Sequence, residues 1–134
     1  MKKIVYLSGG IGGAKLAKGF YNINNIDLTI IVNTGDDETI QGVRLSPDID
    51  SVVYALAGIE GDLGWGQTND SFVVSKEFKK YLSQEFSIGD KDLALNLFRN
   101  QLFSEGKSLT QITKIISDKF GLNCKIFPMS DNSV

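Results

Sequence analysis

The sequence predicts an α/β fold built on a parallel sheet. Three observations predict it: an apolar run over residues 3–7, a glycine-rich loop that opens into a helical pattern, and a second apolar run over residues 28–32. Apolar runs without strict alternation are typical of buried strands in such sheets. Strand, turn, helix and strand in this order make a βαβ unit, whose crossover is right-handed. At 134 residues, we expect one domain.

A glycine-rich loop follows the first strand. Four glycines fall between positions 9 and 13 in the stretch LSGGIGGAKLAKGF, residues 7–20. Glycine allows close backbone approach, and the N–H groups of a strand-to-helix turn, together with the helix N-terminus, favour an anion such as phosphate. The candidate phosphate-binding residues are Gly9, Gly10, Ile11, Gly12 and Lys15. Two alternatives stay open: the loop is a tight turn without a ligand, and Lys15 is a solvated helix residue.

This loop matches neither of two common nucleotide-binding patterns. The dinucleotide fingerprint G-x-G-x-x-G starts at Gly10 and Gly12 but meets Lys15 where its third glycine belongs. The Walker A pattern requires Gly-Lys-Ser/Thr, whereas Ala14, Lys15 and Leu16 stand here. We therefore expect a phosphate or diphosphate site of neither kind.

The next helix has clear boundary signals. Ser46 is a good N-cap, Pro47 suits the first helical position, and Gly58 is a suitable stop. The apolar residues between them recur at helical spacing and predict one buried face: Ile49, Val52, Val53 and Leu56.

Further along, the sequence predicts a loop, three helices and a third strand. Residues 60–69 are expected to be loop and residues 71–82 a helix. The side chains expected to face inward from that helix are Phe72, Phe78 and Leu82. Ser108 and Gln111 form a capping box at the start of the last helix, and residues 124–127 are the third strand.

The stretch Gly89-Asp90-Lys91-Asp92 predicts a turn that begins a helix running to about Leu102. On this helix Asp92, Asn96 and Arg99 are spaced i, i+4 and i+7, so they share one polar face. We expect this face to be solvated, with any pairing of Asp92 and Arg99 a surface contact of small energetic value.

Acidic side chains gather near the ends of predicted elements. The stretch Asn33-Thr34-Gly35-Asp36-Asp37 follows the second strand directly, and Ser46-Pro47-Asp48-Ile49-Asp50 begins the next helix. Ligands bind beyond the carboxyl ends of parallel strands, so this loop and the glycine loop are expected to line the same rim. Carboxylates there hold magnesium or orient a hydroxyl, with Asp36, Asp37 and Asp48 as candidate metal ligands. An ordinary polar turn and a helix-dipole interaction are the alternatives.

The composition restricts the chemistry and the partners. The sequence contains no histidine and one cysteine, Cys124, which argues against zinc and favours a hard, oxygen-bound metal such as Mg²⁺. A single cysteine also excludes an internal disulfide framework and fits the cytoplasm. The net charge of −2 gives no basic field for nucleic acid. No apolar stretch is long enough for a signal peptide core or a membrane span.

Six stretches, in this order, resemble the 2-phospho-L-lactate transferase family: LSGGIGGAKLAKGF, NTGDD, SPDIDSVVYALAG, GWG, GDKD and PMSD. The resemblance covers essentially the whole chain and implies a Rossmann-like α/β core with additional helices. It also implies a role in the biosynthesis of coenzyme F-420. The implied reaction transfers a phospholactyl group, or a phosphoenolpyruvyl group in the bacterial variant, from a guanosine diphosphate-linked donor (lactyl-diphosphoguanosine) to the terminal ribityl hydroxyl of the deazaflavin Fo. GMP leaves, and Mg²⁺ is required.

The resemblance implies roles for individual residues. Asp50 matches the family aspartate that contacts the deazaflavin, and it is a candidate acceptor for the proton of the attacking hydroxyl. Lys91 stands where the family usually has arginine in Gly-Asp-Arg-Asp, which keeps the charge but loses the two-pronged donor. Trp65 in GWG either stacks on a flat ring of a substrate or is a partly buried loop residue. The implied nucleotide- and phosphate-binding residues further include Asn33, Arg99 and Ser130.

Members of this family are longer and continue beyond PMSD. We therefore expect residues 1–134 to be the N-terminal part of a single transferase domain, and the full-length protein to be a homodimer. A site that lacks one wall positions its reactants poorly, so we expect weak or absent turnover from this chain alone.

Two other functional classes stay open at this point. One is a non-catalytic, nucleotide-sugar-binding regulator of the gluconeogenesis-factor group, which shares a glycine loop and an acidic second loop. The other is a generic NAD-binding domain. The Pro-Asp-x-Asp and Gly-Asp-Lys-Asp stretches favour the transferase over the regulator. The absent third glycine argues against the NAD-binding domain.

Overall fold

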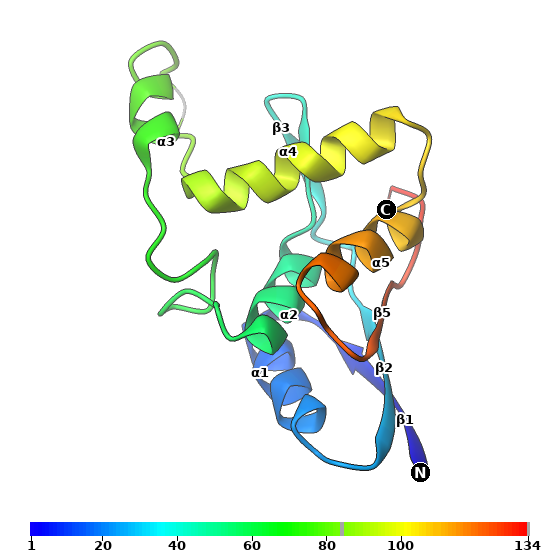
Figure 1. The fold of residues 1–134 in the computed structure, drawn as a ribbon. Coiled ribbons are helices and arrows are strands. Elements are labelled where there is room, and N and C mark those ends of the chain that lie inside the picture. Colours follow the sequence, from blue (N-terminus) through cyan, green and yellow to red (C-terminus); the bar gives the residue numbers. More distant parts are fainter. Residues whose placement is uncertain (84, 134) are drawn as a thin grey trace.

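The fold is a three-stranded parallel sheet with helices packed against one of its faces (Figure 1). This computed structural model describes residues 1–83 and 85–133. The strands are β1 (Lys2–Ser8), β2 (Ile26–Val32) and β5 (Lys125–Pro128), in the spatial order β1-β2-β5. Both strand pairs are parallel, which confirms the predicted fold class and the first βαβ unit.

One face of the sheet is buried, and the other carries exposed apolar side chains. Leu28, Ile30 and Val32 of β2 are almost completely buried. On the opposite face, Val5 is 64% and Leu7 is 73% exposed. The expectation that the first strand is a buried one is therefore wrong for half of its side chains. The reason is that β1 lies at the edge of the described sheet, which has helices on one side.

The helices are α1 (Gly10–Tyr21), α2 (Pro47–Ala57), α3 (Val73–Phe78), α4 (Asp90–Ser104) and α5 (Leu109–Lys119). Of these, α2 lies deepest, and every residue from Asp48 to Leu56 is buried. It packs mainly against α1, also contacts β2, and contributes much of the apolar core. The predicted apolar face is present, but the polar residues of the helix are buried as well.

The predicted helix boundaries are mostly confirmed. The capping box is present, because the Gln111 N–H donates to Ser108 Oγ at 3.2 Å and the Ser108 N–H donates to Gln111 Oε1 at 2.9 Å. Pro47 is the first residue of α2, and Gly58 ends it with φ of 73°. Ser46 occupies the predicted N-cap position, but its side chain accepts no N–H of the helix; its hydroxyl donates to Asp37 at 2.7 Å.

A hairpin that the sequence did not predict lies between β2 and α2. It consists of β3 (Glu38–Ile40) and β4 (Val43–Leu45), joined by Gln41 and Gly42 with φ of 51° and 77°. Positive φ at both central residues is the requirement of a type I′ turn, usually met by Asn-Gly. The hairpin packs against α4, where the Arg44 guanidinium lies 4.6 Å from the centre of the Phe103 ring.

The predicted helix over residues 71–82 is shorter in the structure. Helix α3 covers Val73–Phe78, and Phe72, which was expected to face inward, is 44% exposed. The helix starts at Val73 because the Asp90 carboxylate accepts hydrogen bonds from the N–H groups of Val73 and Val74 and fixes the first turn there. The chain makes turns after Phe78 instead of continuing the helix.

Candidate functional site

The glycine loop and the acidic loop lie side by side at the carboxyl ends of β1 and β2. The Asn33 N–H donates to the Ser8 carbonyl at 2.9 Å, which ties the two loops together. A Cβ on Gly13 would stand 2.8 Å from Ser8 Oγ, so glycine is needed where α1 passes the end of β1. Gly10 begins α1 with φ of 66°, which glycine adopts without strain. The shared rim expected from the strand order is therefore present.

Two neighbouring cavities flank α2. The first has a volume of about 310 Å³ and contains Asp50 in its wall. Its other lining residues include Glu38, Tyr54, Trp65, Asp92 and Asn96. The second, of about 230 Å³, lies against the glycine loop and is lined by Ile11 and Lys15. Ser51 of α2 lines both cavities, so Asp50 and the glycine loop occupy adjoining parts of one region.

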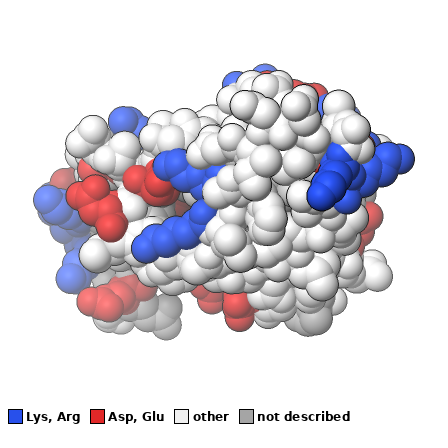
Figure 2. Space-filling model, turned by 90° about the horizontal axis from the view of Figure 1, so that it is seen from below, with Lys and Arg blue, Asp and Glu red and all other residues white. Residues whose placement is uncertain are grey.

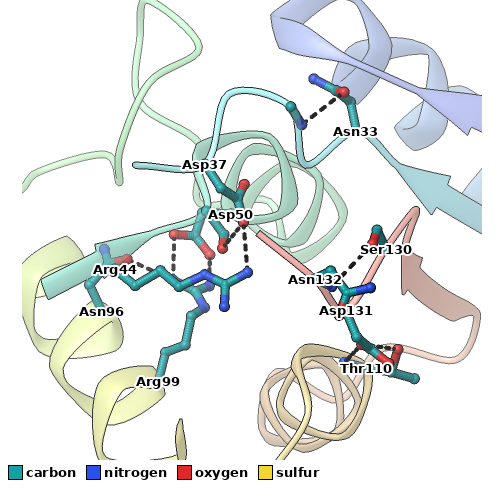
Figure 3. Close-up of polar contacts among 12 residues, drawn as sticks. Asn33, Asp37, Arg44, Asp50, Asn96, Arg99, Thr110, Ser130, Asp131 and Asn132 are labelled. Carbon is teal, nitrogen blue, oxygen red and sulfur yellow. Dashed lines mark hydrogen bonds and ion pairs between the residues drawn. The ribbon is translucent and has the colours of Figure 1, made fainter. Parts of the chain in front are cut away.

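Asp50 is held from behind by Arg99. Arg99 Nη1 donates to Asp50 Oδ2 at 3.2 Å, and Nη2 donates to the other carboxylate oxygen (Figure 3). Arg99 is completely buried, and Nη1 also donates to Asn96 Oδ1 at 2.6 Å. Burial raises the pKa of Asp50, and the charge of Arg99 acts against that rise. We expected Arg99 to contact phosphate, but its two terminal nitrogens have these protein partners in the structure.

The polar face of α4 points into the protein, which corrects the expectation that it is solvated. Asn96 is 2% exposed. Asp92 Oδ1 accepts a hydrogen bond from the Tyr54 hydroxyl at 2.6 Å, and the Asn96 amide donates to the Asp92 carbonyl at 2.8 Å. Burial raises the pKa of Asp92. Sequence reasoning therefore missed Tyr54, Asp92 and Asn96 as cavity residues, although the i, i+4, i+7 polar spacing was a usable signal.

The acidic loop is organised by Asn33. Its amide nitrogen donates to Asp48 Oδ2 at 2.9 Å and to Asp36 Oδ2 at 3.2 Å, which brings these two carboxylates together. Asp37 points elsewhere: it accepts from the Ser46 hydroxyl and lies 3.9 Å from Arg44. Burial raises the pKa of Asp37. Within residues 1–83 and 85–133, no three acidic or cysteine side chains form a ready-made metal site.

Of the remaining candidate residues, Lys15 and Trp65 line cavities, whereas Lys91 and Ser130 do not. Lys15 is exposed and lines the second cavity. Trp65 is 56% exposed and lines the first cavity as well as an adjoining one of about 250 Å³. Lys91 is exposed, and its Nζ lies 3.4 Å from the Asn69 carbonyl, outside the cavity walls. Ser130 follows β5 at the same edge of the sheet, where its hydroxyl accepts from the Asn132 N–H (Figure 3).

The surface carries charges of both signs. On the face drawn in Figure 2, basic and acidic side chains lie close to one another at both sides of the view, and a broad area without charged residues lies between these two groups. This agrees with the net charge of −2, and that face offers no continuous basic surface for a polyanion. No helix in the described part of the chain has the length and apolar character that a membrane span requires.

An open α/β sheet with clefts near the carboxyl ends of its strands is typical of the class of proteins that bind small molecules at this edge. Within this class, residues 4–134 match the model of the family described as 2-phospho-L-lactate transferase CofD. The chain belongs to this family of transferases.

Individual relatives agree with this assignment, and a solved structure shares the fold. The chain is 41% identical over 132 residues to 2-phospho-L-lactate transferase of Methanospirillum hungatei, covering 96% of this chain and 44% of that protein. It is 36% identical over 144 residues to phosphoenolpyruvate transferase of Thermobifida fusca, covering 98% and 45%. A crystal structure of a UPF0052-family protein from Bacillus halodurans superposes with a TM-score of 0.64 at 19% identity, covering 99% of this chain and 41% of that one. The chain thus spans less than half the length of these relatives.

Proposed function

We propose that this chain takes part in transferring a phospholactyl or phosphoenolpyruvyl group from a guanosine diphosphate-linked donor to the ribityl hydroxyl of the deazaflavin Fo, with release of GMP, in coenzyme F-420 biosynthesis. The observation that carries the proposal is the cavity of about 310 Å³ that has Asp50 in its wall and Trp65 at its edge. The names of the relatives, which are transferases of phospholactate or phosphoenolpyruvate, support the class of group transferred.

The character of this cavity suits the acceptor. Three carboxylates, of Glu38, Asp50 and Asp92, line it, and they accept hydrogen bonds from hydroxyl groups. The same carboxylates repel a diphosphate, so a neutral, hydroxyl-rich molecule fits better than the donor. Ile40 and Trp65 provide apolar surface for a flat ring. Asp50 is the residue we assign to accept the proton of the attacking hydroxyl.

The donor is assigned to the adjoining region at the start of α1. The N–H groups of Gly10, Ile11 and Gly12 belong to the first turn of this helix and lack helical acceptors there. Ser8 Oγ is buried beside them and has no hydrogen-bond partner among the described residues. These groups are suited to diphosphate oxygens, with Lys15 one turn further along the helix.

The acidic loop is the proposed position of Mg²⁺. The carboxylates of Asp36 and Asp48 both accept hydrogen bonds from the Asn33 amide, next to the glycine loop. Their oxygens are the hard ligands that Mg²⁺ prefers. Two carboxylates together with substrate phosphates make a usual magnesium environment, so these residues fit the ion. When bound, Mg²⁺ supplies positive charge that neutralises phosphate oxygens.

One assay tests the proposal. The protein is incubated with Mg²⁺, Fo and lactyl-diphosphoguanosine, product and GMP are measured by mass spectrometry, and Fo binding is followed by fluorescence. We expect saturable Fo binding in the presence of Mg²⁺. We also expect GMP release in step with phosphodiester formation, and this turnover is weak or absent if the chain alone lacks part of the donor pocket. Absence of both binding and product contradicts the proposal, and binding of a UDP-sugar without Fo binding identifies the chain as a nucleotide-sugar-binding regulator instead.

A further inference from the structure

Arg99 stands behind the wall of the acceptor cavity rather than in it. The cavity is lined by Asp50, Tyr54, Asp92 and Asn96, whereas Arg99 is completely buried and does not line it. Arg99 nevertheless contacts Asp50 and Asn96 directly. One side chain on α4 therefore fixes two of the cavity's polar groups, one of them on α2.

The contact with Asp50 is a two-pronged one. Each terminal nitrogen of the guanidinium donates to a different oxygen of the carboxylate. Such a planar pair restrains both the position and the rotation of the carboxylate, which a single point charge does not. Each carboxylate oxygen still has acceptor capacity left, and Asp50 lines the cavity, so that capacity is directed to a ligand there.

A second chain of hydrogen bonds stiffens this arrangement. Asn96 accepts from Arg99 Nη1 at 2.6 Å and donates through its amide to the Asp92 carbonyl at 2.8 Å. Asp92 in turn accepts from the Tyr54 hydroxyl, one helical turn beyond Asp50 on α2. The network thus starts and ends on α2 and leaves Arg99 little freedom to move.

Stability alone does not account for this pair. A buried ion pair gains little net free energy, because removing both charges from water offsets most of their attraction. Compared with an apolar contact of the same volume, a buried, two-pronged ion pair fixes the position and rotation of the carboxylate.

We propose that Arg99 is a positioning residue, which holds the Asp50 carboxylate in the orientation that meets the acceptor hydroxyl. This proposal rests on the proposed function for the identity of the acceptor, but the orientation of Asp50 is measurable without it. Arg99 touches neither substrate in this assignment and acts through Asp50.

The test uses Arg99→Lys, which keeps the charge and most of the volume but loses the fork. The matched control is Arg44→Lys, the same exchange at an arginine outside the acceptor cavity. We expect Arg99→Lys to lower kcat roughly 10- to 100-fold with KM for Fo changed less than about threefold, because misplacement of a reacting group acts mainly on the transition state. Arg44→Lys is expected to keep kcat within about twofold. Equal kcat for the two variants overturns the proposal.

Two further measurements keep the outcome decisive. Asn96→Ser retains Arg99 and removes its second acceptor, so it is expected to reduce kcat by a smaller factor than Arg99→Lys does. It replaces Arg99→Lys as the test if that variant does not fold. Crystal structures of the variants and of the unaltered protein compare the Asp50 carboxylate directly. A carboxylate that keeps its orientation without the fork overturns the inference about Arg99. Absence of Fo binding and turnover in the unaltered protein overturns the proposed function instead.

Discussion

Asp70 caps the start of α4, and Asp90 caps the start of α3. Asp70, just before α3, accepts hydrogen bonds from the N–H groups of Lys91 and Asp92 at 2.9 and 3.1 Å, in the first turn of α4. Asp90, the first residue of α4, accepts from the N–H groups of Val73 and Val74 at 3.0 Å, in the first turn of α3. This exchange joins the two helix starts and sets Asp92 in the wall of the cavity that Asp50 also lines. It also gives the Gly-Asp-Lys-Asp stretch a structural role beside any substrate contact.

Gly89→Ala is expected to destabilise the protein by about 1 to 3 kcal/mol, because a Cβ there would overlap the Asp70 carboxylate. The backbone is not the cause, since Gly89 has an ordinary φ of −65°. Gly19→Ala in α1 is the matched control: a Cβ there meets nothing within 4 Å, so this variant should be stabilised by about 0.5 to 1 kcal/mol. Urea unfolding of both variants measures the difference, and a Gly89→Ala protein as stable as the parent would argue against the Asp70 cap.

The cap made by Asp90 is expected to fail in acid. The Ser71 hydroxyl and the N–H groups of Val74 and Val73 lower the pKa of Asp90 from 3.8 in the folded state. A group with a lowered pKa stabilises the fold above its unfolded pKa and loses that contribution as the pH falls through the folded pKa. Asp90→Asn should therefore lower Tm near neutral pH, and the difference from the parent should shrink as the pH falls below 3.8 through the folded pKa. A Tm difference that is constant from neutral to acid pH would exclude this origin.

Asp50→Asn is expected to weaken Fo binding strongly while GDP binding persists. The exchange deletes the charge that faces the cavity, and a hydrogen bond to a charged group contributes about 1.5 to 3 kcal/mol, which is roughly a 10- to 150-fold loss of affinity. Fluorescence titration with Fo and calorimetry with GDP separate the two effects. Asp118→Asn, at an exposed aspartate of α5 paired with Lys114, is the matched control and should change neither. Loss of both ligands to the same extent would contradict the assignment of Asp50 to the acceptor.

Asp48→Asn is expected to weaken the Mg²⁺ dependence of nucleotide binding. The substituted amide still accepts the Asn33 hydrogen bond of 2.9 Å, so the loop is retained while one hard anionic ligand is lost. The Mg²⁺ concentration needed for half-maximal GDP binding should rise roughly tenfold or more. Asp27→Asn, near the opposite end of β2, is the control. Identical Mg²⁺ titrations of the two variants would place the ion elsewhere.

Cys124 is expected to react slowly with alkylating reagents. Burial raises the pKa of its thiol from 9.0 to about 11, so the reactive thiolate is about 100-fold rarer at pH 8 than in an unfolded chain. Iodoacetamide labelling followed by mass spectrometry should show this retardation in buffer and its disappearance in guanidinium chloride. Labelling at the unfolded rate in buffer would show that the thiol is accessible and unperturbed.

Local signals in the sequence predicted those elements whose boundaries are set locally. The capping box at Ser108, the proline at the start of α2 and Gly58 at its end all act within one or two turns of chain, and each is confirmed. The adjoining loops after β1 and β2 followed from parallel pairing alone, since parallel strands end at one edge.

Features that depend on distant partners were not predicted. The spacing of Asp92, Asn96 and Arg99 shows that they share a helix face, but it does not say whether that face meets water or a carboxylate on another helix. The carboxylate is Asp50, 49 positions away in the chain. The hairpin of β3 and β4 was missed because its strands have three residues each and its turn is Gln-Gly.

Helix α2 supplies both the centre of the apolar core and Asp50, the aspartate proposed to meet the acceptor. Any exchange along it that reshapes the cavity also disturbs close packing, so acceptor preference and folding cannot be tuned independently there. Directed evolution toward other acceptors should start from the cavity's partly or well-exposed residues, such as Glu38, Ile40 and Trp65, where side-chain volume can change at little thermodynamic penalty.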